Sequence, residues 1–330
     1  MVSLQKSFIF VIKYEVVNIF NGFEEVKAIK NPILTIGTFD GVHIGHQKII
    51  QQLNEVAERV GGESVLFTFY PHPRMVLFPE NHGLKLIQTQ AEKVQKLQRF
   101  GLDNVIVHPF SKSFSSISAV NFVRDYLVNQ LHVHTVIIGY DHQFGKNREG
   151  SLELLKELAP IYEFNVIEIQ AQDIDDVNVS STKIRSALKE GDISTANNYL
   201  GEPFQLTGKV VHGQKIGRSL GFPTANIAVE SDVKIIPKAG VYFVRVHLEG
   251  AKPAVGIMNI GKRPTLYTDN AQSIEVHILD YNGTIYGQYI TLELLEKLRD
   301  EIKFDSTEAL VQQIQKDEIQ ARNIAPRFKL

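Results

Sequence analysis

The stretch Gly37-Thr38-Phe39-Asp40-Gly41-Val42-His43-Ile44-Gly45-His46 holds two histidines three residues apart around a glycine. The apolar run Ile33-Leu34-Thr35-Ile36 precedes it, and apolar residues after it recur with helical spacing, at Ile49, Ile50, Leu53, Val56, Ala57 and Val60. This pattern predicts that the stretch joins a buried strand to a helix. Because a helix start offers unpaired N–H groups and the positive end of its dipole, such a junction suits phosphate.

The residue types within the stretch also suit phosphate chemistry. Gly41 and Gly45 allow the backbone to approach a ligand closely, and the imidazoles of His43 and His46 can donate hydrogen bonds to phosphate oxygens as charge develops. The alternative is that both histidines are ordinary polar residues at a helix start. The glycine-containing prefix and the preceding strand favour the functional interpretation. The arrangement resembles the nucleotidyltransferase superfamily, whose members bind ATP with this motif and transfer AMP.

Length and composition set limits on the class of protein. A chain of 330 residues with 43% hydrophobic residues fits two domains. A net charge of −2 lacks the basic excess of nucleic-acid binders, so we expect no nucleic-acid partner. The absence of cysteine excludes disulfides, thiolate metal sites and cysteine nucleophiles, and fits a cytoplasmic protein. The apolar run 8–12 is too short to cross a bilayer and has no cleavage site after it, so neither a signal peptide nor a membrane span is expected.

The first half of the chain alternates between strand and helix patterns, which predicts a Rossmann-like parallel sheet covered on both faces. Strands are expected at 33–39, 64–69, 104–110, 135–140 and 165–169, with helices at 48–60, 91–100, 118–130 and 151–158. In such sheets ligands bind beyond the carboxyl ends of the strands. The stretches 37–46 and 139–145 both follow expected strands and are therefore predicted to lie at that edge.

Beyond about residue 190 strands dominate, which predicts a small antiparallel β-barrel with a terminal helix. Short helices are expected at 181–190 and 192–200, strands at 204–211, 240–248, 254–260, 273–280 and 284–292, and a last helix at 306–322 capped by Asp305. Asn282-Gly283 predicts a hairpin between the last two strands. The predicted domains are residues 1–187 and 204–330 with a linker at 188–203, and residues 1–12 are an extension of undetermined role.

Two further stretches of the first half carry polar groups suited to a nucleotide. Gly139-Tyr140-Asp141-His142-Gln143-Phe144-Gly145 follows a strand and precedes Arg148, although a plain loop explains it as well. Ser180-Ser181-Thr182-Lys183-Ile184-Arg185 opens a helix. Its residues either cap that helix or provide a second phosphate grip through hydroxyls, amides and basic side chains.

Together the three stretches resemble the FMN adenylyltransferase module of bacterial FAD synthetases, in order and in spacing. The resemblance implies that His43 and His46 hold the ATP phosphates. It implies further nucleotide or phosphate contacts from Gly37, Phe39, Asp40, Gly41, Gly45, Asp141, Ser181, Thr182 and Arg185. The sequence departs from the family pattern at three positions: Tyr70 stands in place of an acid, His142 in place of an aromatic residue, and Asp141 where some members have Asn.

The second half has its own motif, Gly217-Arg218-Ser219-Leu220-Gly221-Phe222-Pro223-Thr224-Ala225-Asn226. Gly217 and Gly221 allow close approach to phosphates, while Thr224 and Asn226 offer oxygen ligands of the kind that Mg²⁺ accepts beside ATP. Composition alone also fits a turn-rich loop between strands. The motif resembles the riboflavin kinase signature, and the match continues through 240–242, 261–265, 274–278 and 298–306. The resemblance to bifunctional riboflavin kinase/FAD synthetase thus covers the chain from about residue 31.

Glu275 is the candidate base of the kinase reaction. In the run 274–278, Ile274, Val276 and Ile278 are predicted to point to one side and Glu275 and His277 to the other. A carboxylate there can accept the proton of the riboflavin 5′-hydroxyl. The alternative is a solvated glutamate on a strand.

These resemblances imply two consecutive reactions that depend on ATP. The second half converts riboflavin and ATP to FMN and ADP with Mg²⁺, and the first half converts FMN and a second ATP to FAD and pyrophosphate. The expected state is a monomer or transient oligomer. Three alternatives stay open: a chain with one site degenerate, a different nucleotidyltransferase, and a non-enzymatic flavin- or RNA-binding module. Tyr70 and His142 make the adenylyltransferase the site more open to decay.

Overall fold

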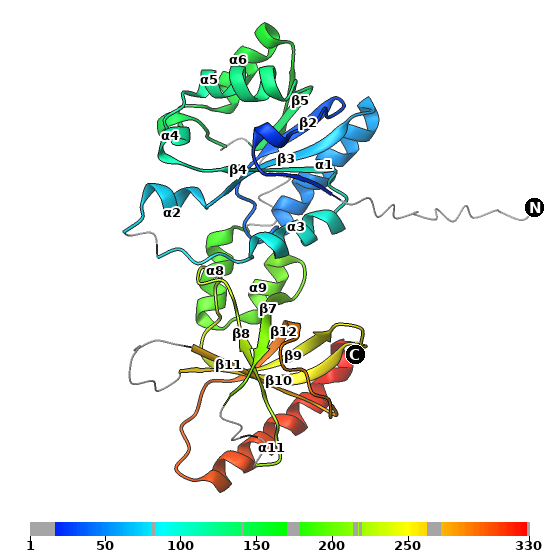
Figure 1. The fold of residues 1–330 in the computed structure, drawn as a ribbon, viewed down its shortest axis with the longest axis vertical. Helices are drawn as coiled ribbons and strands as arrows, with labels where there is room; N and C mark the ends of the chain where they lie inside the picture. Colours follow the sequence, from blue (N-terminus) through cyan, green and yellow to red (C-terminus); the bar gives the residue numbers. More distant parts are fainter. Residues whose placement is uncertain are drawn as a thin grey trace, which may run out of the picture. The chain divides into compact units, whose positions relative to one another are not determined.

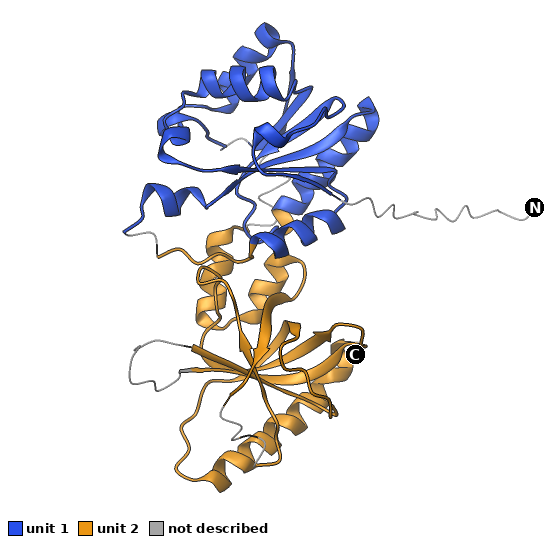
Figure 2. Ribbon diagram, viewed as in Figure 1, with its two compact units in different colours: residues 1–42, 46–82, 90–176 blue, residues 43–45, 83–89, 177–330 orange. Residues whose placement is uncertain are grey.

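The computed structural model describes residues 17–80, 83–139, 142–169, 179–213, 217, 220–262 and 272–328 of the chain. Two compact units are evident (Figure 2). The first, here the sheet unit, comprises residues 1–42, 46–82 and 90–176; the second, the barrel unit, comprises residues 43–45, 83–89 and 177–330. The extension at residues 1–12 and the candidate ligand Asp141 lie outside the described residues.

The sheet unit contains a six-stranded parallel sheet with the order β1-β4-β3-β2-β5-β6 (Figure 1). Its strands are β1 (Asn18–Phe20), β2 (Pro32–Ile36), β3 (Glu63–Tyr70), β4 (Asn104–Pro109), β5 (Thr135–Gly139) and β6 (Asn165–Ile169). From β2 the chain builds the sheet outward through β3 and β4, and later continues on the other side of β2 with β5 and β6. The order therefore reverses at β2 and β5, and parallel sheets bind ligands at this switch point.

Helices cover both faces of the sheet because every strand from β2 to β5 is apolar on both sides. On one face, α1 (Ile44–Val60) and α3 (Gln90–Arg99) bury Leu53 and Leu97 against strand residues. On the other face, Phe122 and Leu155 belong to a second apolar core. Its elements are α5 (Ala119–Phe122), the π-helical η2 (Val123–Gln130) and α6 (Leu152–Tyr162). The predicted parallel sheet with two helical layers is confirmed.

The differences from the predicted elements are small except at the edge. The helix expected from residue 48 begins at Ile44, so the second histidine lies within its first turn. The edge strand β1 was not predicted, because three residues show no periodicity. Short elements complete the unit: η1 (Phe23–Glu25), α2 (Pro73–Leu77), α4 (Lys112–Ser115) and η3 (Lys146–Arg148).

The barrel unit contains a closed six-stranded barrel with the order β10-β11-β8-β7-β12-β9. Its strands are β7 (Phe204–Val211), β8 (Ala225–Ala228), β9 (Gly240–Leu248), β10 (Ala254–Lys262), β11 (Gln272–Ile278) and β12 (Tyr289–Arg299), all paired antiparallel. Alternate residues fill the interior, among them Val244, Met258 and Val276, all fully buried. The predicted barrel is confirmed, with β8 as a strand that the sequence pattern missed.

The hairpin predicted at Asn282-Gly283 is wrong, because β11 and β12 are not neighbours in the barrel. β11 pairs with β10 and β8, whereas β12 pairs with β7 and β9. The intervening residues cross to β7: Tyr286 stacks on His212 with ring centroids 4.1 Å apart, and the N–H of Gly287 donates to Val210 O at 2.9 Å. The last strand consequently begins at Tyr289, five residues later than predicted.

Three helices of the barrel unit lie among the residues that the structure describes. α8 (Ser181–Glu190) and α9 (Ile193–Leu200) share the apolar core of the barrel through Leu188 and Leu200. α11 (Thr307–Ile324) precedes η4 (Ala325–Phe328). Its cap is Ser306, whose Oγ accepts from the N–H of Ala309 at 3.1 Å, and not Asp305 as predicted. Among the described residues, no helix has both the length and the hydropathy that a bilayer span needs.

Candidate functional site

The loop between β2 and α1 has an unusual backbone conformation. Phe39, Gly41 and Val42 have positive φ values of +47°, +92° and +38°. Residues other than glycine seldom adopt this backbone conformation. The N–H of Val42 closes a turn by donating to Phe39 O at 3.3 Å, and Gln47 of α1 donates from Nε2 to Val42 O at 2.9 Å. The loop therefore leaves the sheet in one defined conformation, directly at the switch point.

The two histidines of the motif have different surroundings. The imidazole of His46 stacks on the ring of Phe39 with centroids 4.3 Å apart and planes inclined by 20°. A Cβ at Gly37 would lie 2.9 Å from that ring, which explains the glycine. His43 is buried and packs beside Gly45, where a Cβ would lie 3.3 Å from its ring. Both imidazoles are thus positioned by neighbouring residues of the same motif.

Two lysines that the sequence analysis missed lie beneath this loop. Lys93 of α3 donates from Nζ to Thr38 O at 3.2 Å and to Thr68 Oγ1 at 3.1 Å. Lys96, one turn further along α3, is fully buried and donates to Gly41 O at 3.2 Å. The available signal was their spacing: both fall on the same face of α3 as Leu97, which is buried in the core.

Residues 142–150 follow β5, which pairs with β2 in the sheet. Phe144 and Gly150 exchange backbone hydrogen bonds of 3.1 and 2.8 Å. A Cβ at Gly145 would lie 2.7 Å from the Cα of Ala119, so this position needs glycine. His142, the departure from the family pattern, is half-buried and stacks on Phe144 at 6.4 Å.

The stretch 180–185 begins α8 as predicted, and the capping interpretation holds for its first residue. Ser180 Oγ accepts from the N–H of Lys183 at 3.3 Å. Ser181 and Thr182 occupy the first turn, with Thr182 exposed and Arg185 half-buried. A capped helix start still presents N–H groups and basic side chains, so a role in phosphate binding stays a prediction.

Aromatic side chains gather at the carboxyl ends of β3 and β4, and β3 is the neighbour of β2 in the sheet. Phe69 and Phe110 meet edge to face with centroids 5.4 Å apart, and both contact Phe114 at 5.9 Å. All three are half-buried. Tyr70, the other departure from the family pattern, is 52% exposed at the end of β3. The sequence shows these rings but not that they come together.

In the barrel unit the predicted kinase residues do come together. β8 pairs with β11 so that Asn226 lies opposite Glu275, and Thr224 Oγ1 donates to Glu275 Oε2 at 3.1 Å. The predicted alternation along β11 is confirmed: Ile274, Val276 and Ile278 are buried, while Glu275 and His277 are half-exposed on the other side. His277 Nδ1 donates to Pro223 O at 2.8 Å and so holds the motif against β11.

A cavity of about 450 Å³ opens beside these residues. Its wall includes Gly221, Pro223 and Thr224 from the motif, and Tyr281 and Tyr286 from the crossing segment that replaces the predicted hairpin. Gly221 has a φ of +87°, which favours glycine. Gly217 accepts from the N–H of Phe222 at 2.8 Å and closes the motif into a turn.

Of the three candidate oxygen donors, only Thr224 lines this cavity, but together the three suit a hard cation. Thr224 offers a hydroxyl, Asn226 a buried amide and Glu275 a carboxylate, and Mg²⁺ takes such oxygens while keeping several waters. Clusters of three or more His, Cys, Asp or Glu side chains able to hold a metal are absent from the part of the chain that the structure describes.

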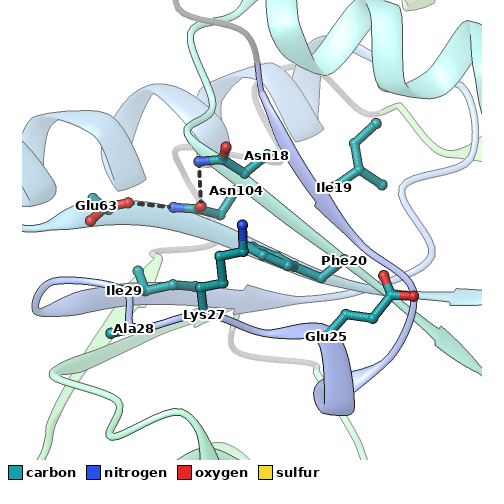
Figure 3. Close-up of a pocket in the computed structure, with 9 residues that line it drawn as sticks. All are labelled: Asn18, Ile19, Phe20, Glu25, Lys27, Ala28, Ile29, Glu63 and Asn104. Atoms are coloured by element: carbon teal, nitrogen blue, oxygen red, sulfur yellow. Dashed lines mark hydrogen bonds between the residues drawn. The ribbon is translucent and has the colours of Figure 1, made fainter.

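A second cavity, of about 550 Å³, lies at the amino ends of β3 and β4, opposite the ligand edge of the sheet (Figure 3). Asn18 donates to Asn104, and Asn104 to Glu63, at 3.1 and 3.0 Å. The exposed Lys27 borders it. None of the motifs lines this cavity.

These features define a class of protein: a nucleotidyltransferase-type sheet with its histidine motif at the switch point, in one chain with a closed barrel that carries the motif 217–226. Two family models match the chain, FAD synthetase over residues 26–183 and riboflavin kinase over residues 200–325. The chain belongs to the bifunctional riboflavin kinase/FMN adenylyltransferase family.

The relatives cover most of the chain. The bifunctional riboflavin kinase/FMN adenylyltransferase of Listeria monocytogenes is 39% identical over 293 residues, which are 88% of this chain and 92% of that protein. The protein of the same name from Buchnera aphidicola is 36% identical over 91% of this chain and 95% of its own length. A solved structure described as a macrolide-efflux protein from Streptococcus pneumoniae is 30% identical, with a TM-score of 0.83, and matches 94% of this chain and 99% of that one.

Proposed function

We propose that this chain makes FMN from riboflavin in its barrel unit and then FAD from FMN at the loop between β2 and α1 (residues 37–43), here called the phosphate loop. The observation that supports the proposal is the position of each family motif. The histidine stretch follows β2 at the switch point of the sheet, and in the barrel Glu275 lies opposite Asn226 and accepts a hydrogen bond from Thr224, which lines a cavity. ATP and the flavins are the substrates, and ADP, pyrophosphate and FAD leave.

In the kinase reaction Glu275 is the base. Its Oε1 accepts the proton of the riboflavin 5′-hydroxyl as the γ-phosphoryl group moves to that oxygen and ADP departs. The hydroxyl of Thr224 donates its proton to Oε2, which orients the carboxylate and turns the lone pairs of the threonine oxygen outward. Gly217 and Gly221 give the phosphates room close to the backbone.

Mg²⁺ is the proposed metal of the kinase site, held by Thr224 and Asn226. When bound, it supplies neutralisation of the phosphate charge that phosphoryl transfer requires. Asn226 lies opposite Glu275 in the β8–β11 pair, so the amide and the carboxylate share one side of the sheet. The rest of the catalytic work falls to the chain, which orients the carboxylate and encloses the phosphates.

In the adenylyltransferase reaction the FMN phosphate attacks the α-phosphorus of ATP, and pyrophosphate leaves. This nucleophile is already anionic, so no protein base is needed. His43, His46 and the start of α1 stabilise the charge that builds on the α-phosphate and the leaving group. Gly37, Phe39, Asp40, Gly41 and Gly45 form the loop around the phosphates, with Asp141, Ser181, Thr182 and Arg185 as further contacts. Phe69 and Phe110 offer the flat flavin ring an apolar wall.

The functional boundary lies at about residue 187, and residues 188–203 connect the two activities although α9 within them is packed on the barrel core. The chain acts as a monomer or transient oligomer in the cytoplasm, without nucleic acid.

The test is to incubate the protein with riboflavin, ATP and Mg²⁺ and to separate the flavins over time. FMN rises first and FAD follows. The double variant His43→Ala, His46→Ala loses FAD formation and keeps FMN formation, whereas Glu275→Ala loses FMN formation and still adenylylates supplied FMN. A folded variant that lost both activities would contradict the assignment of one reaction to each motif. If the wild type made FMN but no FAD, the adenylyltransferase part of the proposal would be wrong.

A further inference from the structure

Helix α3 presents two ammonium groups to the underside of the phosphate loop. Lys93 Nζ lies 3.2 Å from Thr38 O, and Lys96 Nζ lies 3.2 Å from Gly41 O. Both lysines are buried, with exposed fractions of 6% and 0%. They are three residues apart on one helix, so a single rigid element holds both contacts.

The accepting carbonyls occupy informative positions in the loop. Thr38 O precedes Phe39, and Gly41 O precedes Val42, and these are the two residues other than glycine that have positive φ in the loop. Because C=O and N–H point in opposite directions in a trans peptide, an ammonium that binds Thr38 O turns the N–H of Phe39 away from α3. The peptide between Gly41 and Val42 is held at both ends, by Lys96 and by the bond from the N–H of Val42 to Phe39 O. His43 follows directly.

The contact of Lys93 is a closed group of three partners. Thr68 Oγ1 of β3 accepts from Lys93 at 3.1 Å and lies 3.3 Å from Thr38 O, to which it donates. The strand, the helix and the loop thus meet at one carbonyl oxygen. This geometry determines how the chain turns away from β2 toward the histidines.

Buried ammonium groups are a costly way to fill this space. Apolar side chains of similar volume commonly serve packing as well as or better than buried charges. Burial lowers the pKa of Lys93 to about 8, and the nearby carboxylate of Asp40 opposes that change. The other charged groups near it are Glu92 and Lys96 of α3, while β3 presents the neutral Thr68.

We propose that Lys93 and Lys96 are positioning residues for adenylyl transfer, which hold the phosphate loop in its left-handed conformation by binding the carbonyls of Thr38 and Gly41. The inference rests on the proposed function of that loop. Neither lysine touches the reacting atoms; each acts through the backbone that carries Phe39 and the histidines. Loss of the Lys93 proton weakens its grip on Thr38 O, so FAD formation falls as the pH rises above about 8 while FMN formation does not follow it.

The experiment compares Lys93→Met and Lys93→Arg with the wild type. The matched control is Lys27→Met, an exposed lysine of the same unit at the opposite edge of the sheet. FAD formation from FMN and ATP is measured from about pH 7 to about pH 10, with riboflavin phosphorylation as the internal reference on the same chain. Circular dichroism and thermal unfolding report the folding of each variant.

The expected result is a fall of about tenfold in kcat for FAD formation by folded Lys93→Met at pH 7, with KM for ATP little changed and FMN formation intact. Its residual activity no longer declines at high pH, because the titrating group is absent. Lys93→Arg stays charged over the whole pH range, so its FAD formation should not decline at alkaline pH. This variant tests the inference if Lys93→Met does not fold.

Two outcomes would overturn the inference: full FAD formation by Lys93→Met, or an alkaline decline that persists unchanged in Lys93→Arg. Failure of the proposed function is a separate result, since the wild type would then make no FAD from FMN at any pH. A similar loss in Lys27→Met would also count against the inference, because it would show a general effect of removing lysine charge.

Discussion

Thr224 joins two requirements of the kinase site in one hydroxyl group. Its O–H donates a hydrogen bond to Glu275 Oε2, with 3.1 Å between the two oxygens. The lone pairs of the threonine oxygen remain available at the cavity that Thr224 lines. We expect Thr224→Val, which keeps the shape and removes the hydroxyl, to lower kcat/KM for riboflavin phosphorylation by about a hundredfold. Thr224→Ser keeps the hydroxyl and stays within about tenfold of the wild type. Steady-state assays of FMN formation distinguish the two, and equal losses would show that the methyl group matters and the hydroxyl does not.

Single residues differed in how well their sequence context predicted them. Glu275 was recognisable because apolar residues alternate around it, and β11 has that alternation. Lys93 and Lys96 were not recognisable as site residues, because lysines on a helix normally lie on its solvated face. Only the packing of α3 against the loop makes them buried, and that packing depends on residues more than fifty positions away along the chain.

Helix α11 is held to the barrel by one buried ion pair and one exposed pair. Asp317 has a side chain only 4% exposed and accepts from Arg299 Nη2 at 2.8 Å, while Asp280 has a side chain 73% exposed and pairs with Arg322. We expect Asp317→Asn to lower the free energy of unfolding of the barrel unit by about 3 kcal/mol, because it leaves the half-buried guanidinium of Arg299 without its counter-charge.

The matched change on the surface is Asp280→Asn, and it is expected to lower the free energy of unfolding much less than Asp317→Asn does, because water screens the exposed pair. Asparagine also tolerates the positive φ of +56° at this position, so the backbone adds no strain of its own. Denaturant unfolding followed by circular dichroism measures both. Equal losses would mean that burial does not control the strength of these ion pairs.

Elements with strong periodicity were predicted well, and elements defined by their neighbours were not. β7 and β9 have the predicted bounds, and β6 does as well. β12 was placed too early because Asn282-Gly283 has the composition of a hairpin turn. The barrel instead places β8 and β7 between these strands, and no local pattern records which strands become neighbours across a closed sheet.

At the scale of the whole molecule, the two units respond to alkaline pH in opposite ways. Burial lowers the pKa of Lys93 from 10.5 to about 8, so between these values the unfolded chain binds a proton that the folded sheet unit has lost, and stability rises with pH. Burial raises the pKa of Tyr242 from 10.0 to about 12, so in that window the folded barrel unit keeps a proton that the unfolded chain loses, and stability falls with pH.

Calorimetry at a series of pH values tests this pair of trends, since a chain of two units need not unfold in one step. The difference in stability between wild type and Lys93→Met should shift by about 3 kcal/mol in favour of the wild type between pH 8 and pH 10.5. The corresponding difference for Tyr242→Phe should change in the opposite sense above pH 10. If the stability difference between wild type and either variant did not change with pH, burial would not shift the pKa of that residue as described.

Local pattern was enough to predict the parallel sheet and the barrel and the strand-to-helix junction at residues 37–46, and together with the family resemblance it made His43, His46 and Glu275 candidates for the site. Those features depend on periodicity and on residue types close together in the chain, which sequence records directly. The strand order that puts β2 beside β5, the meeting of Thr224 with Glu275, and the two lysines beneath the phosphate loop were decided by tertiary structure. They join residues that are distant in sequence, and such contacts form only when the core of the unit that contains them packs.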